Sequence, residues 1–388
     1  MHQMNPAAIA NGATHTVFPA VAGAIIVALI LWETFETVVL PRRVARRFRF
    51  TVLVYRSIWL PWKAIARGFS GKKARETFLS FFGPLSLLIL FAVWAFVIVC
   101  GFALMYYSNS SRDTTHPTFE TCLYFSGTTM FTLGIGDVTP HTTRERVLVV
   151  CEGGLGLGFL ALILSYLPVI YQAFSRREVN IVLLDARAGS PPTATELLRR
   201  HPGPSYAADL EQVLRDWERA CADILESHVS YPAVSYFRSQ HTNESWLAAV
   251  TAILDTSSLL LACIDHPATR QAKLTFAMCR HAVVDLSQLF GEPPVRDGAD
   301  RLPSAEYRRM YAVLTQAGFQ VRDEFQSCQK LTKLRAMYEP FVLALSRYLY
   351  MEVPPWILAK EIIDNWKTSA WGRISGVAGD SQLFDDHD

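Results

Sequence analysis

Residues 132–137 have the composition of a cation site built from the main chain. The segment consists of Thr132, Leu133, Gly134, Ile135, Gly136 and Asp137. Its alternating glycines can adopt backbone conformations that a Cβ atom would forbid, so that consecutive carbonyl oxygens face one axis. Such carbonyls replace the water shell of a dehydrated cation. The spacing therefore predicts coordination of a cation by backbone oxygens, with the side chains packed behind them.

Three apolar segments are long enough to hold this motif in a membrane. Hydrophobic residues make up 51% of the 388 residues and charged residues only 19%, which is more apolar than an average soluble chain. The predicted spans are residues 17–40, 85–107 and 147–171. Each approaches or exceeds the roughly 20 helical residues that cross a hydrocarbon core. Residues 1–16 contain no Lys or Arg, so the first span lacks the basic start of a signal peptide and is expected to stay in the protein.

Residues 41–78 are strongly basic, with Glu76 as their one acidic residue. By the positive-inside rule this loop is cytoplasmic, the N-terminus lies outside, and the third span returns inward to Arg176 and Arg177. Within the loop, residues 50–69 mix apolar and basic side chains, which favours a helix in the headgroup plane over a fourth span. The basic charges at 42–75 are expected either to bind anionic lipid or only to set the topology.

The segment before the glycine motif is too short to cross the membrane. Pro117 suits the first turn of a helix over residues 119–130, because a missing N–H is not needed there. The carbonyl end of this helix would point to the membrane centre and favour a cation. The glycine-bearing strand then returns outward, and such irregular backbone is tolerated at membrane depth only along a watery path or inside protein. These elements predict a re-entrant pore loop.

The order of these elements resembles the potassium-channel superfamily, whose members share an outer helix, a pore helix, a TxGxGD filter and an inner helix. The resemblance covers about residues 85–171 and implies passive transport of K⁺ through the filter, with no other cofactor. It implies that K⁺ is coordinated by the carbonyls of Thr132, Leu133, Gly134 and Ile135 and by the Thr132 hydroxyl. Gly136 would let the strand turn, and Asp137 would ring the outer mouth. Since one loop supplies a quarter of the carbonyl cage, the resemblance implies a homotetramer, with a mixed tetramer as the alternative.

Ile135 departs from the family pattern. Most filters of the superfamily carry Tyr or Phe there, whose ring packs and hydrogen-bonds behind the filter, whereas isoleucine supplies volume without a hydroxyl. Aliphatic residues occur at this position in some two-pore-domain relatives. The sequence therefore predicts a K⁺ preference, with a weakly selective cation channel as the alternative.

Several residues of the spans are candidates for gating or bracing. The candidate hinge residues of the third span are Gly153, Gly154, Gly156, Gly158 and Pro168. Tight helix packing is the alternative role of the glycines. Glu152 either braces the region behind the filter or lies at the outer interface beside Arg144 or Arg146, and the interface is the expectation. Glu33 and Glu36 share one face of the first span and are expected to pair with the basic loop.

The residues after 178 predict a soluble helical bundle. Helical patterns cover residues 205–227, 243–264, 267–290, 304–335, 338–351 and 355–366. Asp255 and its Ser and Thr neighbours favour a buried bundle helix over a further span at 246–264. Val179 to Leu184 resembles a strand, but no GxGxxG follows it. The seven scattered cysteines and the absence of HExxH, GxSxG and P-loop motifs predict neither a metal centre nor an enzyme.

Together these patterns predict an all-α membrane protein in four parts. An N-terminal span with a basic segment occupies 1–79, a pore domain 80–178, a cytoplasmic helical domain 179–370 and a flexible acidic tail 371–388. The resemblance implies a tetrameric cation channel, and the absence of targeting extensions predicts the plasma (inner) membrane. The helical domain is expected to bias the gate and either to bind an unidentified ligand, to hold the tetramer together or to contact another protein, and nucleic acid is not expected. The alternative is a membrane-anchored signalling or scaffold protein with a non-conducting pore.

Overall fold

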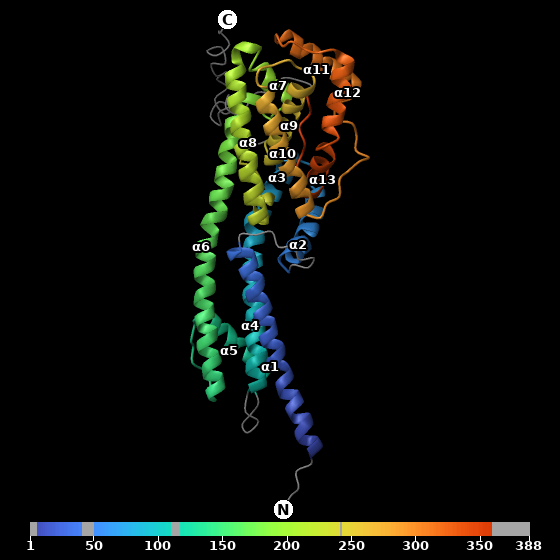
Figure 1. Cartoon of the computed structure of the whole chain (residues 1–388). Helices are drawn as coiled ribbons and strands as arrows, with labels where there is room; N and C mark the ends of the chain where they lie inside the picture. Colours follow the sequence, from blue (N-terminus) through green and yellow to red (C-terminus); the bar gives the residue numbers. More distant parts are fainter. Residues whose placement is uncertain (1–5, 41–49, 110–116, 241–242, 359–388) are drawn as a thin grey trace, which may run out of the picture. The chain divides into compact units, whose positions relative to one another are not determined.

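The computed structural model describes residues 6–40, 50–109, 117–240 and 243–358 (Figure 1). Within these ranges the regular elements are helices, and one isolated bridge joins Ile264 to Val321. The chain forms two compact units. Unit 1 consists of Met1–Ile65 and Phe81–Tyr171, and unit 2 consists of Ala66–Ser80 and Gln172–Asp388. The predicted acidic tail at 371–388 lies outside the described residues.

Three helical stretches among the described residues are long and apolar enough to cross a membrane: Val17–Val39, Lys72–Asn109 and Thr143–Ala188. This confirms the predicted number of spans. The first stretch is formed by α1 (Pro6–Thr34) and the π-helical turn η1 (Phe35–Val39), the second by α3 (Lys72–Ser80) and α4 (Phe82–Asn109), and the third by α6 (Thr143–Ala188). The second and third stretches are longer than the expected spans because polar residues continue each helix beyond its apolar run.

The prediction of a strand at Val179 to Leu184 is wrong, because α6 continues through these residues to Ala188. Ile181 and Leu184 are buried, whereas Val179 and Val182 are exposed. Buried positions three apart indicate a helical face rather than a strand, in which alternate residues share a face. The β-branched residues of this segment therefore follow the helix that precedes them.

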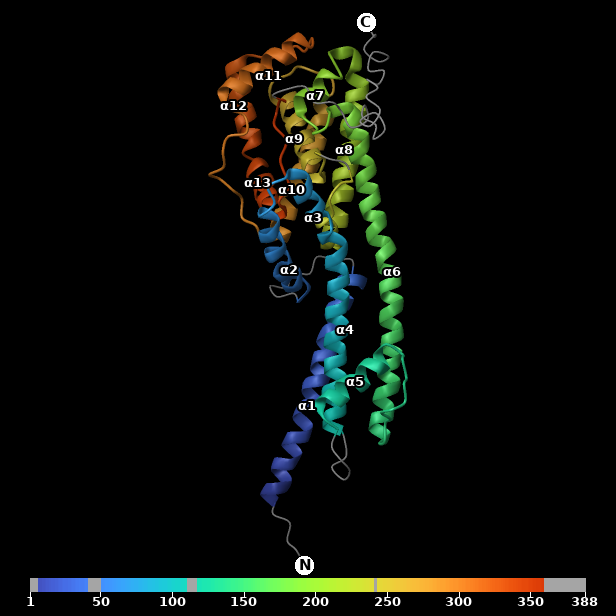
Figure 2. The same cartoon turned by 180° about the vertical axis from the view of Figure 1, so that it is seen from behind.

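Helices α1 and α4 pack closely in unit 1, where they lie side by side (Figures 1 and 2). A Cβ atom on Gly23 would lie 2.3 Å from the carbonyl oxygen of Gly101, and one on Gly101 would lie 2.6 Å from Val27 Cγ2. Facing glycines allow two membrane helices to approach more closely than larger residues would. The α1 and α4 backbones therefore meet at these two glycines.

Glu33 and Glu36, at the end of the first span, accept hydrogen bonds from the start of the next helix and from Trp32 of the same span, respectively. Glu33 Oε1 accepts a hydrogen bond of 2.9 Å from the Thr51 N–H, at the start of α2 (Phe50–Arg67). Glu36 Oε1 accepts one of 2.7 Å from Trp32 Nε1. Glu33 thus satisfies a free N–H in the first turn of α2, where a carboxylate is also favoured by the helix dipole. The arginines between residues 41 and 49, with which this pair was expected to interact, lie outside the described residues.

Unit 2 is a bundle of helices around α9. Besides α3 and the end of α6, its helices are α7 (Ala194–Arg199), α8 (Ala207–Ser230), α9 (Trp246–Ala262), α10 (Thr269–Leu289), α11 (Ser304–Gln316), α12 (Glu324–Arg335) and α13 (Glu339–Leu349), with short 3-10 turns η2 (Pro204–Tyr206) and η3 (Pro232–Tyr236). Helix α9 has 17 residues and is buried almost throughout. Its Asp255 accepts hydrogen bonds from Arg301 at 2.8 Å and from Tyr338 at 2.5 Å. The expectation of a buried bundle helix is confirmed.

One helix prediction in unit 2 is wrong, and a second is tested only over residues 355–358, because residues 359–366 lie outside the described residues. The predicted helix at 304–335 is divided, because Gly318 adopts a left-handed φ of 81° after α11 and Asp323 caps the start of α12. Glycine after a helix and aspartate before one are common end signals. The described part of the helix expected at 355–366, residues 355–358, is not helical. Tyr350 ends α13 in a left-handed conformation, and the prolines that follow do not restart it.

The end of α6 is held in unit 2 by a buried arginine. Arg177 donates hydrogen bonds of 2.9 Å to the carbonyl oxygens of Val234 and Phe237 and forms a 3.0 Å ion pair with Glu178. His228 Nε2 lies 3.3 Å from Arg177 Nη1. Burial, and secondarily the Arg177 charge, lower the pKa of His228 well below 6.5. His228 therefore favours its neutral form in the folded protein.

Unit 2 is expected to lose stability as the pH falls through about 6.5, because the unfolded chain then takes up a proton that buried His228 does not. The stabilising effect of neutral His228 is fully present above that pH. Denaturant unfolding of the full chain in detergent at about pH 7.5 and 5.5 measures the difference. His228→Gln should reduce this difference, whereas His281→Gln, at a side chain 60% exposed, should leave it unchanged. Equal pH dependence in both variants would contradict the assignment.

Candidate functional site

The expected pore helix is present as α5 (Phe119–Met130). Thr118 caps its start, since its hydroxyl oxygen accepts a hydrogen bond of 3.2 Å from the Thr121 N–H. Pro117 therefore precedes the cap instead of occupying the first turn. The aromatic rings of Phe125 and Tyr106 pack edge to face at 4.9 Å and fix α5 against α4. The last turn of α5 leads directly into the glycine motif.

The beginning of the glycine motif is hydrogen-bonded to the last turn of α5. The Leu133 N–H donates to the Thr128 carbonyl at 2.8 Å, and the Thr132 N–H donates to the Thr129 carbonyl at 3.0 Å. These bonds leave the carbonyls of the motif itself free for other partners. The position of α5 therefore determines where those carbonyls lie.

The backbone of residues 132–136 alternates in handedness. Thr132, Gly134 and Gly136 have φ of 57°, 55° and 86°, while Leu133 and Ile135 between them stay at negative φ. A change of handedness at every residue turns successive peptide planes so that their carbonyls can face one side, unlike the alternating carbonyls of a β-strand. For β-branched Thr132 this conformation costs on the order of 1–3 kcal/mol. Such a cost is typical of functional segments.

Asp137 and Glu145 fix the segment that follows the motif. Asp137 Oδ1 accepts a hydrogen bond of 3.0 Å from the Val138 N–H, and the Tyr124 hydroxyl of α5 lies near the same carboxylate. Glu145 Oε2 accepts from the N–H groups of His141 and Thr142 at 2.8 and 3.0 Å, and its own N–H donates to Thr142 Oγ1 at 3.2 Å. This reciprocal pair is a capping box that defines the start of α6.

Glu152 joins three helices of unit 1. It is fully buried, and its Oε2 accepts a 2.7 Å hydrogen bond from the Tyr106 hydroxyl of α4. Its Oε1 accepts a hydrogen bond from the Ser126 hydroxyl of α5, which also lies 2.9 Å from the Val99 carbonyl oxygen. The expected position at the outer interface beside Arg144 or Arg146 is wrong. Hydroxyl donors from α4 and α5 satisfy the carboxylate, so it can be buried away from water.

Among the candidate hinge glycines, Gly156 has a packing role. A Cβ atom there would lie 2.1 Å from the Met130 carbonyl oxygen, whereas one on Gly153, Gly154 or Gly158 would meet nothing within 4 Å. Helix α6 therefore touches the end of α5 at Gly156. The hinge role of the other glycines and of Pro168 stays a prediction. Tyr124, Ser126 and Tyr106 were not recognised from the sequence, because isolated hydroxyl side chains carry no motif.

Gly156→Ala should destabilise unit 1, because the added methyl group meets a backbone atom that cannot rotate away. Overpacking of this kind costs roughly 1–3 kcal/mol. Gly158→Ala adds the same group in open space two residues later and is the matched control. Thermal melting of the detergent-solubilised protein, followed by size-exclusion chromatography, should give a lower midpoint for Gly156→Ala alone. Equal midpoints would show that α5 and α6 do not meet there.

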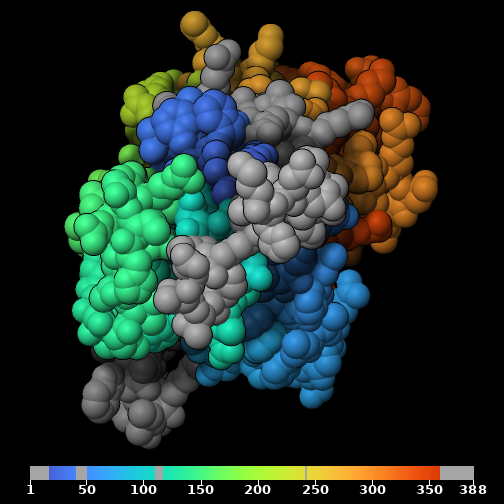
Figure 3. Space-filling view, turned by 90° about the horizontal axis from the view of Figure 1, so that it is seen from below, coloured from blue at the N-terminus to red at the C-terminus, as the bar shows by residue number. Residues whose placement is uncertain are grey.

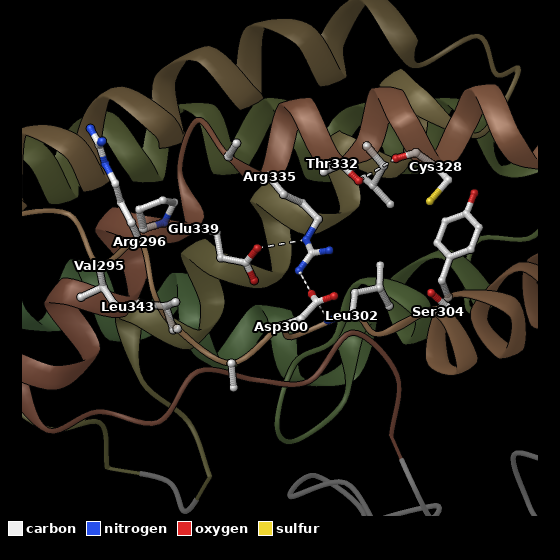
Figure 4. A pocket seen from close by; sticks show the side chains of 16 residues that line it. Val295, Arg296, Asp300, Leu302, Ser304, Cys328, Thr332, Arg335, Glu339 and Leu343 are labelled. Atoms are coloured by element: carbon white, nitrogen blue, oxygen red, sulfur yellow. Dashed lines mark hydrogen bonds and ion pairs between the residues drawn. The ribbon is translucent and has the colours of Figure 1, made fainter.

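Unit 2 contains a cavity of about 410 Å³ between α11, α12, α13 and the segment that precedes α11. Figure 4 shows Arg335 between two carboxylates: its Nη2 lies 2.5 Å from Asp300 Oδ1 and its Nε lies 3.0 Å from Glu339 Oε2. Partial burial opposes ionisation of Asp300, but hydrogen bonds from Arg335 and from the Leu302 N–H lower its pKa. The described lining also contains Cys328 and Ser304 and no histidine.

Comparison with known proteins agrees with this geometry. Residues 88–172 match the family model described as "Ion channel", which covers most of α4, all of α5, the glycine motif and much of α6. The chain is 27% identical over 206 residues to "Uncharacterized membrane protein YdjJ" of Bacillus subtilis (strain 168), an alignment that covers 51% of this chain and 58% of that protein. The chain thus spans less than two thirds of that relative's length. No solved structure matches the chain. Residues 88–172 of this membrane protein therefore match an ion-channel family, and the match is consistent with the potassium-channel superfamily.

Proposed function

We propose that the protein is a tetrameric cation channel that prefers K⁺. The observation that carries this proposal is the alternation of left-handed and right-handed φ along residues 132–136. This segment is hydrogen-bonded to the end of the short helix α5, within the residues that match an ion-channel family. A row of carbonyls that face one side is what a dehydrated cation needs in place of water. The carbonyls of Thr132, Leu133, Gly134 and Ile135 and the Thr132 hydroxyl form the proposed K⁺ sites, with Asp137 at the outer mouth.

Assembly of four chains follows from the physical chemistry of the filter. Irregular backbone cannot face lipid within the hydrocarbon core, because its polar groups would lose their hydrogen-bond partners. In one chain the side chains of Leu133 and Ile135 are 63% and 60% exposed. In the proposed tetramer they pack behind the carbonyls while the neighbouring subunits close the ring. Each chain contributes one side of the conduction path.

The proposed orientation places the N-terminus outside and unit 2 in the cytoplasm. The described basic side chains include Lys72, Lys73 and Arg75 in α3, and clusters of this kind stay on the cytoplasmic side of a plasma membrane. They also suit contact with anionic lipid headgroups. The filter then opens outward, and the end of α6 enters the cytoplasmic helical domain, where the cavity of unit 2 is available to an unidentified ligand.

A weakly selective cation channel is the second candidate, and Ile135 favours it. An aliphatic side chain fills space behind the filter but has no hydroxyl to fix the filter diameter by hydrogen bonding. Native mass spectrometry of the purified protein would report the proposed tetramer. Under bi-ionic K⁺ and Na⁺ conditions, a reversal potential near zero would support the weakly selective channel over the K⁺-preferring one.

Liposomes that contain the full-length protein should take up K⁺ down its gradient, and Gly134→Asp should abolish this uptake. Aspartate at a φ of 55° is strained and places a charge where the chain must adopt a left-handed turn. Gly291→Asp is the matched control, because Gly291 also has a positive φ, of 68°, with nothing within 4 Å of an added Cβ. Its flux should equal that of the original protein.

One outcome would contradict the channel, and another would contradict the assignment of the filter. The first is an absence of flux from correctly inserted protein under every ionic gradient, which would favour a signalling or scaffold protein with a non-conducting pore. The second is an equal loss of flux in Gly134→Asp and Gly291→Asp, which would assign the effect to general damage and not to the filter.

A further inference from the structure

We infer that Glu152 is a positioning residue of the filter and that it maintains K⁺ over Na⁺ discrimination by holding Ser126 of the pore helix. This inference rests on the proposed channel function and concerns the regulation of filter geometry within it. Glu152 does not contact the conduction path. It acts through hydrogen bonds behind the filter, at the junction of α4, α5 and α6.

The contacts form a continuous route from Glu152 to the filter. Glu152 accepts a hydrogen bond from Ser126, in the second half of α5. Two and three residues later, the carbonyls of Thr128 and Thr129 accept the N–H groups that begin the filter. A shift of α5 at Ser126 is therefore passed to the carbonyls of Thr132 and Leu133 through a single helical turn.

A second contact one turn further along fixes the same pair of helices. Gly156 follows Glu152 by four residues, and Met130 follows Ser126 by four residues. Residues four apart lie on the same helix face. Glu152 meets Ser126 through a hydrogen bond, and Gly156 meets Met130 through backbone contact. Two contacts with equal spacing set both the rotation and the height of α5 against α6.

The chemistry of the contact requires a carboxylate. Both carboxylate oxygens accept here: Tyr106 donates to Oε2, and the single Ser126 hydroxyl proton is shared between Oε1 and the Val99 carbonyl oxygen. Glutamine has one carbonyl oxygen and an amide group that only donates, so it replaces the charged acceptor of the Ser126 proton by a neutral donor and leaves that proton to the Val99 carbonyl alone. The Tyr106 bond in turn ties the carboxylate to the outer helix. Ile135 has no hydroxyl that could hydrogen-bond behind the filter. The hydrogen bonds of this junction instead hold the filter in place through the pore helix.

Selectivity is the property that such a brace should control. A carbonyl cage distinguishes K⁺ from Na⁺ by the spacing and stiffness of its oxygens, and supported sites lose function when the surrounding residues allow small displacements. Loss of the brace should therefore relax the filter without removing it. The expected change is a lower K⁺ to Na⁺ permeability ratio with flux retained.

The test measures bi-ionic reversal potentials of the full-length protein in planar bilayers for Ser126→Ala, Glu152→Gln and the double variant. Each single variant should lower the permeability ratio by about tenfold, the range expected for one lost hydrogen bond to a charged group. A tenfold change shifts the potential by about 59 mV. Because both residues act in one contact, the double variant should be no worse than the more affected single variant.

Ser86→Ala is the matched control. Ser86 is also a buried serine of unit 1, but its hydroxyl donates to the Gly83 carbonyl within α4, at 2.7 Å, away from the pore helix. Its permeability ratio should equal that of the original protein. Native mass spectrometry of every variant checks that the assembly is unchanged. If Glu152→Gln fails to assemble, Ser126→Ala decides the outcome, since it removes one hydroxyl and leaves the carboxylate in place.

The outcomes separate this inference from the proposed function. Original protein that conducts and selects K⁺, together with unchanged ratios in Ser126→Ala and Glu152→Gln, would overturn the role of Glu152 and leave the channel intact. A fall of the same size in Ser86→Ala would also overturn it, because any buried hydroxyl would then suffice. Original protein that conducts no ion would refute the proposed function itself.

Discussion

Unit 1 depends on one constraint: the main-chain carbonyls of residues 132–136 lie outside regular secondary structure and still need hydrogen-bonding or coordinating partners. At membrane depth such groups need an ion, water or protein as partner, and the left-handed φ values at Thr132, Gly134 and Gly136 keep this segment out of any helix or sheet. The surrounding elements compensate for that instability. Helix α5 binds the beginning of the segment, and α6 closes on the end of α5 at Gly156.

Buried charged residues organise the other junctions of the protein. Glu152 lies where α4, α5 and α6 meet, Arg177 binds two carbonyls of the segment between α8 and α9, and Asp255 binds Arg301 from the middle of an apolar helix. A charge removed from water needs several fixed hydrogen-bond partners, and leaving it unpaired is costly. Each of these residues therefore requires a specific arrangement of neighbours, whereas apolar packing tolerates many.

Much of the fold could be predicted because it depends on local sequence. The spans follow from runs of apolar residues, and the pore helix follows from its length and from the glycines after it. The errors arise where local signals compete. At Val179 to Leu184 the β-branched residues favour a strand, but they follow an existing helix. Extending a helix by one residue adds a hydrogen bond and avoids the unfavourable nucleation step, so the helix continues. Between 304 and 335, the helical pattern continued across Gly318, which the structure uses as a helix end.

The sequence by itself determined that the chain has three apolar helices long enough to cross a membrane and that a glycine-bearing loop lies between two of them, since these properties depend on residue type and neighbouring spacing. Only the tertiary structure decided which carboxylates are buried and what binds them. It brought Glu152 to Ser126, which is 26 residues away, and it distinguished Gly156 from Gly158 by what lies opposite each. Contacts between distant residues depend on how whole helices pack, and residue type alone does not specify that arrangement.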